Sequence, residues 1–253
     1  DAEAMIEARK REALVLLALS ALPFEAHKKL WDTLDVSYFM RHEAADIAWH
    51  TRHLSRHVGT PQPVVRARQS LAGEGLQVLV YAADQSDLFA RICGYFDRAG
   101  FSILDARVHT ANNGYALDTF QVVSDALQGH YRELTHMVEN DLMQAIVQGG
   151  PLPEPGRRRV SRRVKSFPIT PRVTLRPDEK AQRWLLGISA SDRAGLLYLV
   201  ARVLARHGLS VQLAKVSTLG ERVEDTFLVQ GPELQNNLRQ IEIETELLHA
   251  LSA

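Results

Sequence analysis

The sequence predicts an α+β protein in which two copies of one small unit follow an all-α segment. The first observation is an internal repeat, because residues 76–123 align with residues 184–229. Asp84 thereby matches Asp192 at a spacing of 108 residues (192 − 84). The second observation is that both copies alternate strand-like and helix-like patterns in the same order. Two copies of one fold are therefore expected.

The helical segment comes first and is expected to span residues 1–60. Its first helix is predicted over residues 4–19. The chain starts inside this helix without a methionine, so we expect it to be a piece of a longer protein. Four large aromatic side chains are expected to pack the segment rather than to stack on a base. They are Trp31, Tyr38, Phe39 and Trp49.

Each repeated copy then opens with a strand and a helix. Residues 76–81 are β-branched and aliphatic and precede a polar turn, which is typical of a strand. The apolar residues after the turn recur every three to four positions, as on one face of an amphipathic helix. Gly100 and Gly208 stand where a helix C-terminus favours a residue that tolerates positive φ. The apolar positions are Leu88, Ile92, Tyr95 and Phe96 in the first copy and Leu196, Leu199, Val200 and Val203 in the second.

Two further strands and a second helix complete each copy. Turns rich in Asn, Gly and charged residues separate the two strands. The order β-α-β-β-α, with room for a final strand, predicts the split βαβ arrangement of ferredoxin-like folds, written βαββαβ. The strands are expected over residues 102–110, 115–123, 210–218 and 223–229, and the helices over residues 129–147 and 233–250.

A candidate for the final strand follows only one of the two copies. Residues 170–176 supply a candidate after the first copy, whereas the chain ends soon after the last helix of the second. Either the second unit lacks this strand, or the two units share or exchange it. The expected organisation is a helical segment over 1–60, a first unit over 70–176 that includes a basic linker at 150–168, and a second unit over 177–253.

The turn between the first strand and the first helix resembles that of ACT domains, which are small regulatory modules that bind amino acids. The second copy carries the Asp-x-x-Gly-Leu pattern of that family, followed about a dozen residues later by Gly-Leu-Ser-Val at 208–211. In the first copy Asp87 stands where the family has glycine. The resemblance implies paired ACT domains that bind an amino acid between them.

The flanking segments narrow this resemblance. Residues 37–54 (SYFMRHEAADIAWHTRHL), the run GYALDTF, the linker RRVKSFPITPRVTL and the run LGERVEDTFLV are similar to the C-terminal part of bifunctional uridylyltransferase/uridylyl-removing enzymes. Those enzymes modify the PII nitrogen-signalling protein. The resemblance implies a cytoplasmic regulatory region of nitrogen metabolism that senses glutamine and acts allosterically on catalytic domains upstream. It also implies that residues 1–60 end a phosphohydrolase-type domain.

Composition excludes several other classes of protein. Lys and Arg number 30 against 30 Asp and Glu, so no net charge favours nucleic acid as a partner. The single cysteine, Cys93, excludes an internal disulfide and suits a reducing cytoplasm. We interpret it as a small core residue rather than a reactive thiol. No apolar run approaches the roughly 18 residues that would indicate a membrane span.

The chemistry of uridylyl transfer and removal is missing from the sequence. Nucleotidyl transfer needs a Gly-Ser turn followed by paired acidic residues that hold Mg²⁺ and the triphosphate, and hydrolysis by a metal phosphohydrolase needs a His-Asp dipeptide. Neither pattern occurs. We expect no catalytic residue, metal or cofactor here, with Mg²⁺ confined to the catalytic domains of the parent enzyme. The chain alone is expected to be inactive.

Two other groups of residues leave alternatives open. His50, His53 and His57 fall on one helix face with His42 close by. Such a spacing could hold a metal ion that hydrolyses phosphoesters. Neighbouring arginines would repel a cation, so we interpret the histidines as a solvated or domain-contacting face. The basic run at 157–165 is either a solvated connection or a contact for phosphate, for an acidic PII surface or for the upstream domains.

The candidate ligand site lies at the turn after the first strand of each copy. An amino acid carries a carboxylate and an ammonium, so it needs N–H donors at a helix N-terminus and an acidic or amide acceptor nearby. The same turns could instead be ordinary N-caps, and Asp118 and Asp225 are interpreted as structural. The alternative function is an oligomerisation or PII-docking module that binds no amino acid. The candidate residues are Asp84, Gln85, Ser86, Asp87, Leu88, Ser102 and Asp105, with Asp192, Arg193, Ala194, Gly195, Leu196, Ser210 and Gln212.

Overall fold

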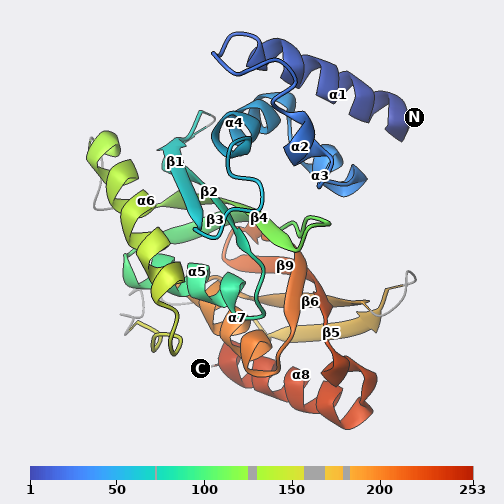
Figure 1. Cartoon of the computed structure of the whole chain (residues 1–253). Helices are drawn as coiled ribbons and strands as arrows, with labels where there is room; N and C mark the ends of the chain where they lie inside the picture. The colour runs from blue at the N-terminus through green and yellow to red at the C-terminus, as the bar shows by residue number, and fades with distance from the viewer. Residues whose placement is uncertain (72, 125–129, 157–168, 179–182, 253) are drawn as a thin grey trace.

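The N-terminal helices form the all-α segment expected from the sequence (Figure 1). Two of them begin at an aspartate whose carboxylate caps a free N–H group: Asp1 accepts from the N–H of Glu3, and Asp35 from that of Tyr38. The computed structural model describes residues 1–71, 73–124, 130–156, 169–178 and 183–252. The helices are α1 Ala2–Leu17, α2 Lys28–Trp31, α3 Val36–Arg41 and α4 Ala44–Leu54.

The first unit is a four-stranded antiparallel sheet with two helices on one face. The strands lie in the order β1-β2-β4-β3. The helix expected after the polar turn and the helix expected near residue 129 are both present (Figure 1). The elements are β1 Val64–Gln69, β2 Leu76–Ala83, α5 Leu88–Arg98, β3 Ser102–Arg107, β4 Tyr115–Val123 and α6 Tyr131–Gln148.

The second unit repeats this arrangement. Its four main strands lie in the order β5-β6-β9-β7, and the short strand β8 pairs with β9. The elements are β5 Arg172–Pro177, β6 Arg183–Ser191, α7 Leu196–Arg206, β7 Ser210–Lys215, β8 Thr218–Leu219, β9 Arg222–Gln230, the 3-10 helix Pro232–Gln235 and α8 Asn237–Ser252. The tandem ferredoxin-like α+β fold is confirmed.

The fourth strand of each unit comes before the repeat rather than after it. The candidate at residues 170–176 forms β5, which pairs with β6 of the second sheet, so its expected place in the first unit is wrong. The first unit takes β1 at the same position, next to β2. An edge strand pairs with only one antiparallel neighbour. A strand that precedes this neighbour in the chain can therefore fill the edge position as well as a strand that follows the last helix. The chain order in each unit is therefore β-β-α-β-β-α.

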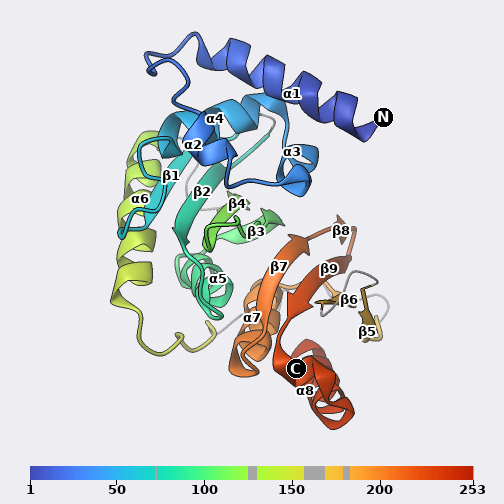
Figure 2. The same ribbon diagram turned by 45° about the vertical axis from the view of Figure 1, so that its right-hand side comes forward.

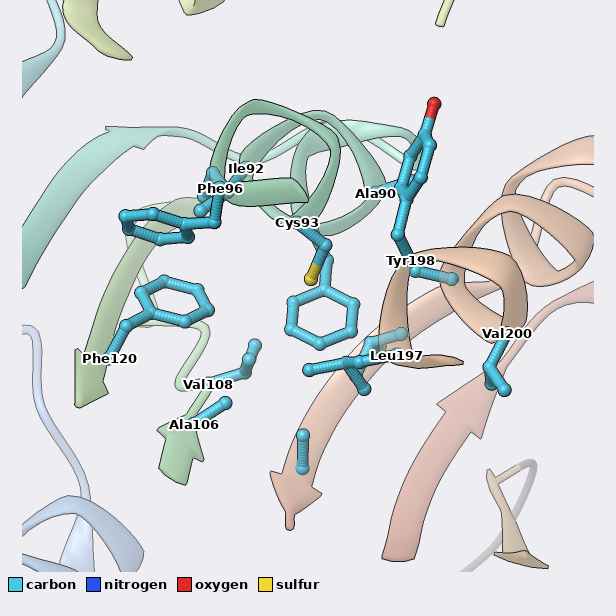
Figure 3. Packing of buried hydrophobic residues seen from close by; sticks show 14 of the residues in the cluster. Ala90, Ile92, Cys93, Phe96, Ala106, Val108, Phe120, Leu197, Tyr198 and Val200 are labelled. Atoms are coloured by element: carbon cyan, nitrogen blue, oxygen red, sulfur yellow. The ribbon is translucent and has the colours of Figure 1, made fainter. Parts of the chain in front are cut away.

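The two units pack side by side along α5 and α7, and the edge strands β3 and β7 run next to each other (Figure 2). We call this contact the seam. Cys93 on α5 and Leu197 on α7 point into the space between the two helices (Figure 3). Both are buried in one apolar core that continues from the first unit into the second. Cys93 is free and buried, as expected for a core residue.

A second core joins the helical segment to the opposite face of the first sheet. Leu79, Tyr81 and Leu117 project from β2 and β4 toward buried residues of the helices, including Tyr38 and Phe39. The first sheet is thus covered by α5 and α6 on one face and by the helical segment on the other (Figure 1). None of the described helices is both long enough and apolar enough to cross a membrane.

Gly94 allows α5 and α7 to approach closely. A Cβ at this position would lie 2.8 Å from Cε1 of Tyr198 and 3.2 Å from Cγ of Pro153. The Tyr198 hydroxyl donates to the Pro153 carbonyl, which limits how far the ring can move.

We expect Gly94→Val to lower the free energy of unfolding by about 1–3 kcal/mol through overpacking, measured by urea unfolding. Gly73→Ala, where a Cβ would meet open space, should change it by less than about 0.5 kcal/mol; equal effects would contradict this role of Gly94.

Candidate functional site

A cavity of about 190 Å³ opens at the seam, and both units line it. The second unit contributes the turn from Asp192 to Leu196 and the start of α7. The first unit contributes the end of α5 and the start of β3, including Ser102. The structure therefore brings together six of the candidate residues, the five of the second-copy turn and Ser102. We call this space the seam cavity.

The second-copy turn directs the N-terminus of α7 at the seam cavity. The chain leaves β6 at Ser191, and the N–H of Asp192 donates to the carbonyl of Glu221 at 2.7 Å. Gly195 is the N-cap of α7 and has a φ of 79°, in the left-handed region that glycine tolerates. The first N–H groups of a helix have no partner within it and carry partial positive charge. This end of the cavity therefore suits a carboxylate.

Two carboxyl groups of the second unit line the same cavity. Burial raises the pKa of Asp192. Asp225 is buried and accepts a hydrogen bond from the N–H of Ser217 at 3.1 Å. Burial raises the pKa of Asp225 to about 6, and the nearby charge of Asp192 adds to the increase. A cationic ligand group would relieve the repulsion between these carboxylates, as an ammonium does.

Two other polar side chains of the seam cavity, those of Arg193 and Asp97, bind backbone groups of the protein. The guanidinium of Arg193 donates to the carbonyl of Ala250 at the end of α8. Asp97 accepts from the N–H of Gly156 at 3.0 Å, which fixes the chain beyond α6 at the seam. Arg193 therefore lines the cavity with its charge turned toward α8.

The first-copy turn lies outside the seam cavity and is tied to its own unit. The N–H of Asp84 donates to the carbonyl of Gly114 at 3.0 Å. Its counterpart in the second copy, Asp192, donates in the same way to the carbonyl of Glu221. Asp87 forms an ion pair with Arg91 at 2.8 Å. Arg91 in turn donates to the carbonyls of Gly149 and Gly150 beyond α6. A ligand role for Asp84, Gln85, Ser86, Asp87 and Leu88 stays a prediction.

The remaining candidates are on other surfaces of the described residues. Asp105 pairs with Arg107 at 3.1 Å and lines a separate cavity of about 380 Å³ between the helical segment and the first sheet. The amide of Gln212 donates to the hydroxyl of Ser210 at 3.0 Å on β7. The structure does not bring these three residues into the seam cavity.

Several residues of the seam cavity were not expected from the sequence. Asp225 was interpreted as structural, and it does bind the Ser217 N–H, but it also lines the cavity. The repeat carried a signal for it, because Asp118 matches Asp225 at a spacing of 107 residues (225 − 118). Cys93, Phe101, Tyr198 and Val216 also line it, and nothing in their local pattern distinguishes them from core residues.

Comparison with known proteins finds relatives over the whole length of the chain. Residues 1–53 match the family model of the uridylyltransferase GlnD fifth domain. The chain is 56% identical to the bifunctional uridylyltransferase/uridylyl-removing enzyme of Ralstonia nicotianae over 257 residues, and 54% identical to those of Burkholderia thailandensis and Burkholderia mallei over 252 residues. Over its whole length the chain is thus similar to the C-terminal part of these bifunctional enzymes. The alignments cover 100% of this chain but only 29–30% of each relative, and they fall in the C-terminal part of those enzymes.

Two histidines of the helical segment, His42 and His50, are buried. His50 Nδ1 lies 2.6 Å from the hydroxyl of Tyr38, and the ring of His42 meets that of His50 edge-on at 5.0 Å. Burial lowers the pKa of His50 to about 3 and that of His53 to about 4, so both rings are neutral at pH 7. Within the described part of the chain, no three His, Cys, Asp or Glu side chains are grouped to hold a metal.

The raised pKa of Asp225 predicts that the stability of this chain depends on pH. A carboxyl group whose pKa is higher in the folded state stabilises that state below its unfolded pKa, and the contribution disappears as pH rises through the folded value. Between pH 4 and pH 7 we expect the wild type to lose up to about 3 kcal/mol of unfolding free energy relative to Asp225→Asn. Urea unfolding of both proteins across this range measures the difference.

The control for this experiment is Asp141→Asn, at an exposed carboxylate on α6. Its unfolding free energy should follow that of the wild type at every pH. A wild-type curve parallel to that of Asp225→Asn would show that the carboxyl group of Asp225 has no raised pKa.

Proposed function

We propose that this chain is the regulatory C-terminal region of a bifunctional uridylyltransferase/uridylyl-removing enzyme, and that it binds glutamine in the seam cavity. Glutamine binding would switch the uridylylation and deuridylylation of PII by catalytic domains upstream. The observation that carries the proposal is the seam cavity itself, where the Asp-x-x-Gly-Leu turn of one unit faces β3 of the other.

The polar groups of the seam cavity suit the two charges of an amino acid. The N-terminus of α7 would receive the α-carboxylate. Asp192 and Asp225 would receive the α-ammonium, and the ammonium would favour their ionised forms. These groups recognise any small zwitterion of suitable size, and the choice of glutamine rests on the family resemblance.

The seam explains how binding could act at a distance. The cavity has walls from both units, so a ligand that touches both favours one relative arrangement of the units over another. An allosteric coupling of roughly 1–3 kcal/mol between ligand and catalytic domains is enough to change which activity dominates. The helical segment packs on the first unit, and in this proposal it would connect the seam with the upstream catalytic domains.

The same proposal assigns catalysis to the missing part of the enzyme. Both active sites, with their Mg²⁺, would lie upstream of Asp1, and this chain would be inactive on PII by itself. Its partners would be glutamine, PII and the upstream domains of the same cytoplasmic protein, with neither nucleic acid nor membrane involved.

Isothermal titration with glutamine, with glutamate as the control ligand, tests the binding site. We expect saturable binding of glutamine alone, and Asp192→Asn should weaken it by at least about tenfold through loss of a charged partner. The matched control is Asp141→Asn, at an exposed carboxylate on α6 outside the seam cavity, which should keep the wild-type affinity. A flat titration with both this chain and the full-length enzyme would instead favour a docking or oligomerisation module.

A second experiment tests regulation in the full-length enzyme. With Asp192→Asn, the glutamine concentration at which uridylyl removal replaces transfer should rise by about tenfold or more. The rates at zero glutamine should match those of the wild type, because the upstream active sites are unchanged. If Asp192→Asn changes activity at the same glutamine concentration as the wild type, the seam cavity is not the regulatory site.

A further inference from the structure

The cavity of about 380 Å³ between the helical segment and the first sheet has no part in the proposed function. We call it the segment cavity. Its volume falls within the range of roughly 300–1,000 Å³ that small-molecule sites occupy. Among the described residues, Leu104 alone lines both this cavity and the seam cavity. The two cavities are therefore neighbours with different walls.

The walls of the segment cavity are tied to each other by arginines. Arg41, the last residue of α3, donates from Nη1 to the carbonyl of Val108 at 3.1 Å and from Nη2 to that of Ala214 at 3.0 Å. One guanidinium thus binds the helical segment to both units. Arg107 of β3, which lines the cavity, donates to the backbone carbonyl of Arg41. The cavity is therefore formed before any ligand enters it.

The charged side chains at the segment cavity are paired within the protein. Asp46 of α4 binds Arg68 of β1 at 2.9 Å, and Asp105 binds Arg107 at 3.1 Å. Glu74, also on the wall, is exposed to solvent. A charged ligand would leave water without a free countercharge inside the cavity, which is costly. The interior therefore suits an uncharged ligand.

The sheet side of the segment cavity carries neutral hydrogen-bonding groups. Gln77 of β2 pairs with Gln121 of β4, and Thr119 lies on the same face two residues along β4. Oε1 of Gln77 accepts from Nε of Arg68 at 2.8 Å, which leaves the NH₂ group of Gln77 as a donor. Neither this group nor the Thr119 hydroxyl has a hydrogen-bond partner among the described residues. Both are therefore available to a ligand.

Two buried histidines line the segment cavity from the other side. His42 and His50 are each only 2% exposed. Burial lowers the pKa of His42 far below its usual range, as it does for His50, so each neutral ring has one N–H donor and one acceptor nitrogen. His50 shares a hydrogen bond with Tyr38, whereas the ring of His42 has no hydrogen-bond partner in the described part of the chain. A buried polar group is costly to leave unpaired, so a ligand that pairs with His42 lowers that cost.

We propose that the segment cavity is a second small-molecule site, and that its ligand is an uncharged planar heterocycle with an imide edge, as in a uracil-type base. An imide presents two carbonyl acceptors on either side of one N–H donor. The NH₂ group of Gln77 would donate to one carbonyl, the Thr119 hydroxyl would accept from the N–H, and the His42 ring would donate to the other carbonyl. Trp49 adds an aromatic side chain to the wall, which favours a planar ring. This inference does not rest on the proposed function.

Isothermal titration with uridine, whose base carries an imide edge, tests the site. The wild-type chain should bind uridine saturably at one site. Uridine methylated at N3 lacks the imide N–H and should bind at least about tenfold more weakly. A flat uridine titration, or equal affinity for the two nucleosides, would overturn the proposal.

Thr119→Val tests whether uridine lies in the segment cavity, because it removes the hydroxyl and changes the shape of the side chain little. The affinity for uridine should fall about three- to tenfold, and Gln77→Met should have an effect of similar size. The matched control is Thr226→Val, at the exposed counterpart of Thr119 in the second sheet, 107 residues along the chain (226 − 119). It should keep the wild-type affinity. Unchanged affinity in both folded cavity variants contradicts the proposed location.

Asp192→Asn separates the two cavities, because Asp192 lines the seam cavity and not the segment cavity. This variant should bind uridine with wild-type affinity. If it loses uridine while Thr119→Val keeps it, uridine occupies the seam cavity and the inference is wrong. A flat glutamine titration with normal uridine binding would overturn the sensor and keep the site in the segment cavity.

Discussion

The packing of α5 against α7 is the contact on which the functional surfaces of this chain depend. The ring of Tyr198 lies against the bare backbone of Gly94, and the apolar core continues beneath both helices. This close approach fixes the N-terminus of α7 beside β3 of the other unit, which creates the seam cavity. It also brings the carbonyls of Val108 and Ala214 within reach of one guanidinium. The packing between the units therefore determines which polar groups meet at the seam.

Two buried carboxyl groups, one in each unit, dominate the electrostatics near the seam. A buried carboxyl group is costly unless it is hydrogen-bonded, protonated or paired with a cation. Asp118 and Asp225 each receive one backbone hydrogen bond, which leaves part of that cost in place. In the second unit the seam cavity leaves room for a cation from outside the chain.

Much of the fold could be predicted from the sequence because it is encoded in local patterns. The repeat, the amphipathic helices and the strand pairs after them were expected with nearly the observed bounds. The place of β5 was not, because the pairing of an edge strand depends on contacts with a distant strand. The repeat held the information, since β1 and β5 also begin 108 residues apart (172 − 64), but their sequences share too little to align. The second-copy turn was found by its motif, whereas Asp225 and Arg41 act through contacts that only the packed units create.

The position of the edge strand in each unit has a consequence for how such proteins arise. Each unit begins at its edge strand and ends with its last helix, so one uninterrupted stretch of chain folds into a complete sheet with its covering helices. A single duplication of the corresponding stretch of gene therefore yields two finished modules that exchange no strand. Each copy is then free to change its turn separately, and the turn of the first copy has Asp87 where that of the second has Gly195.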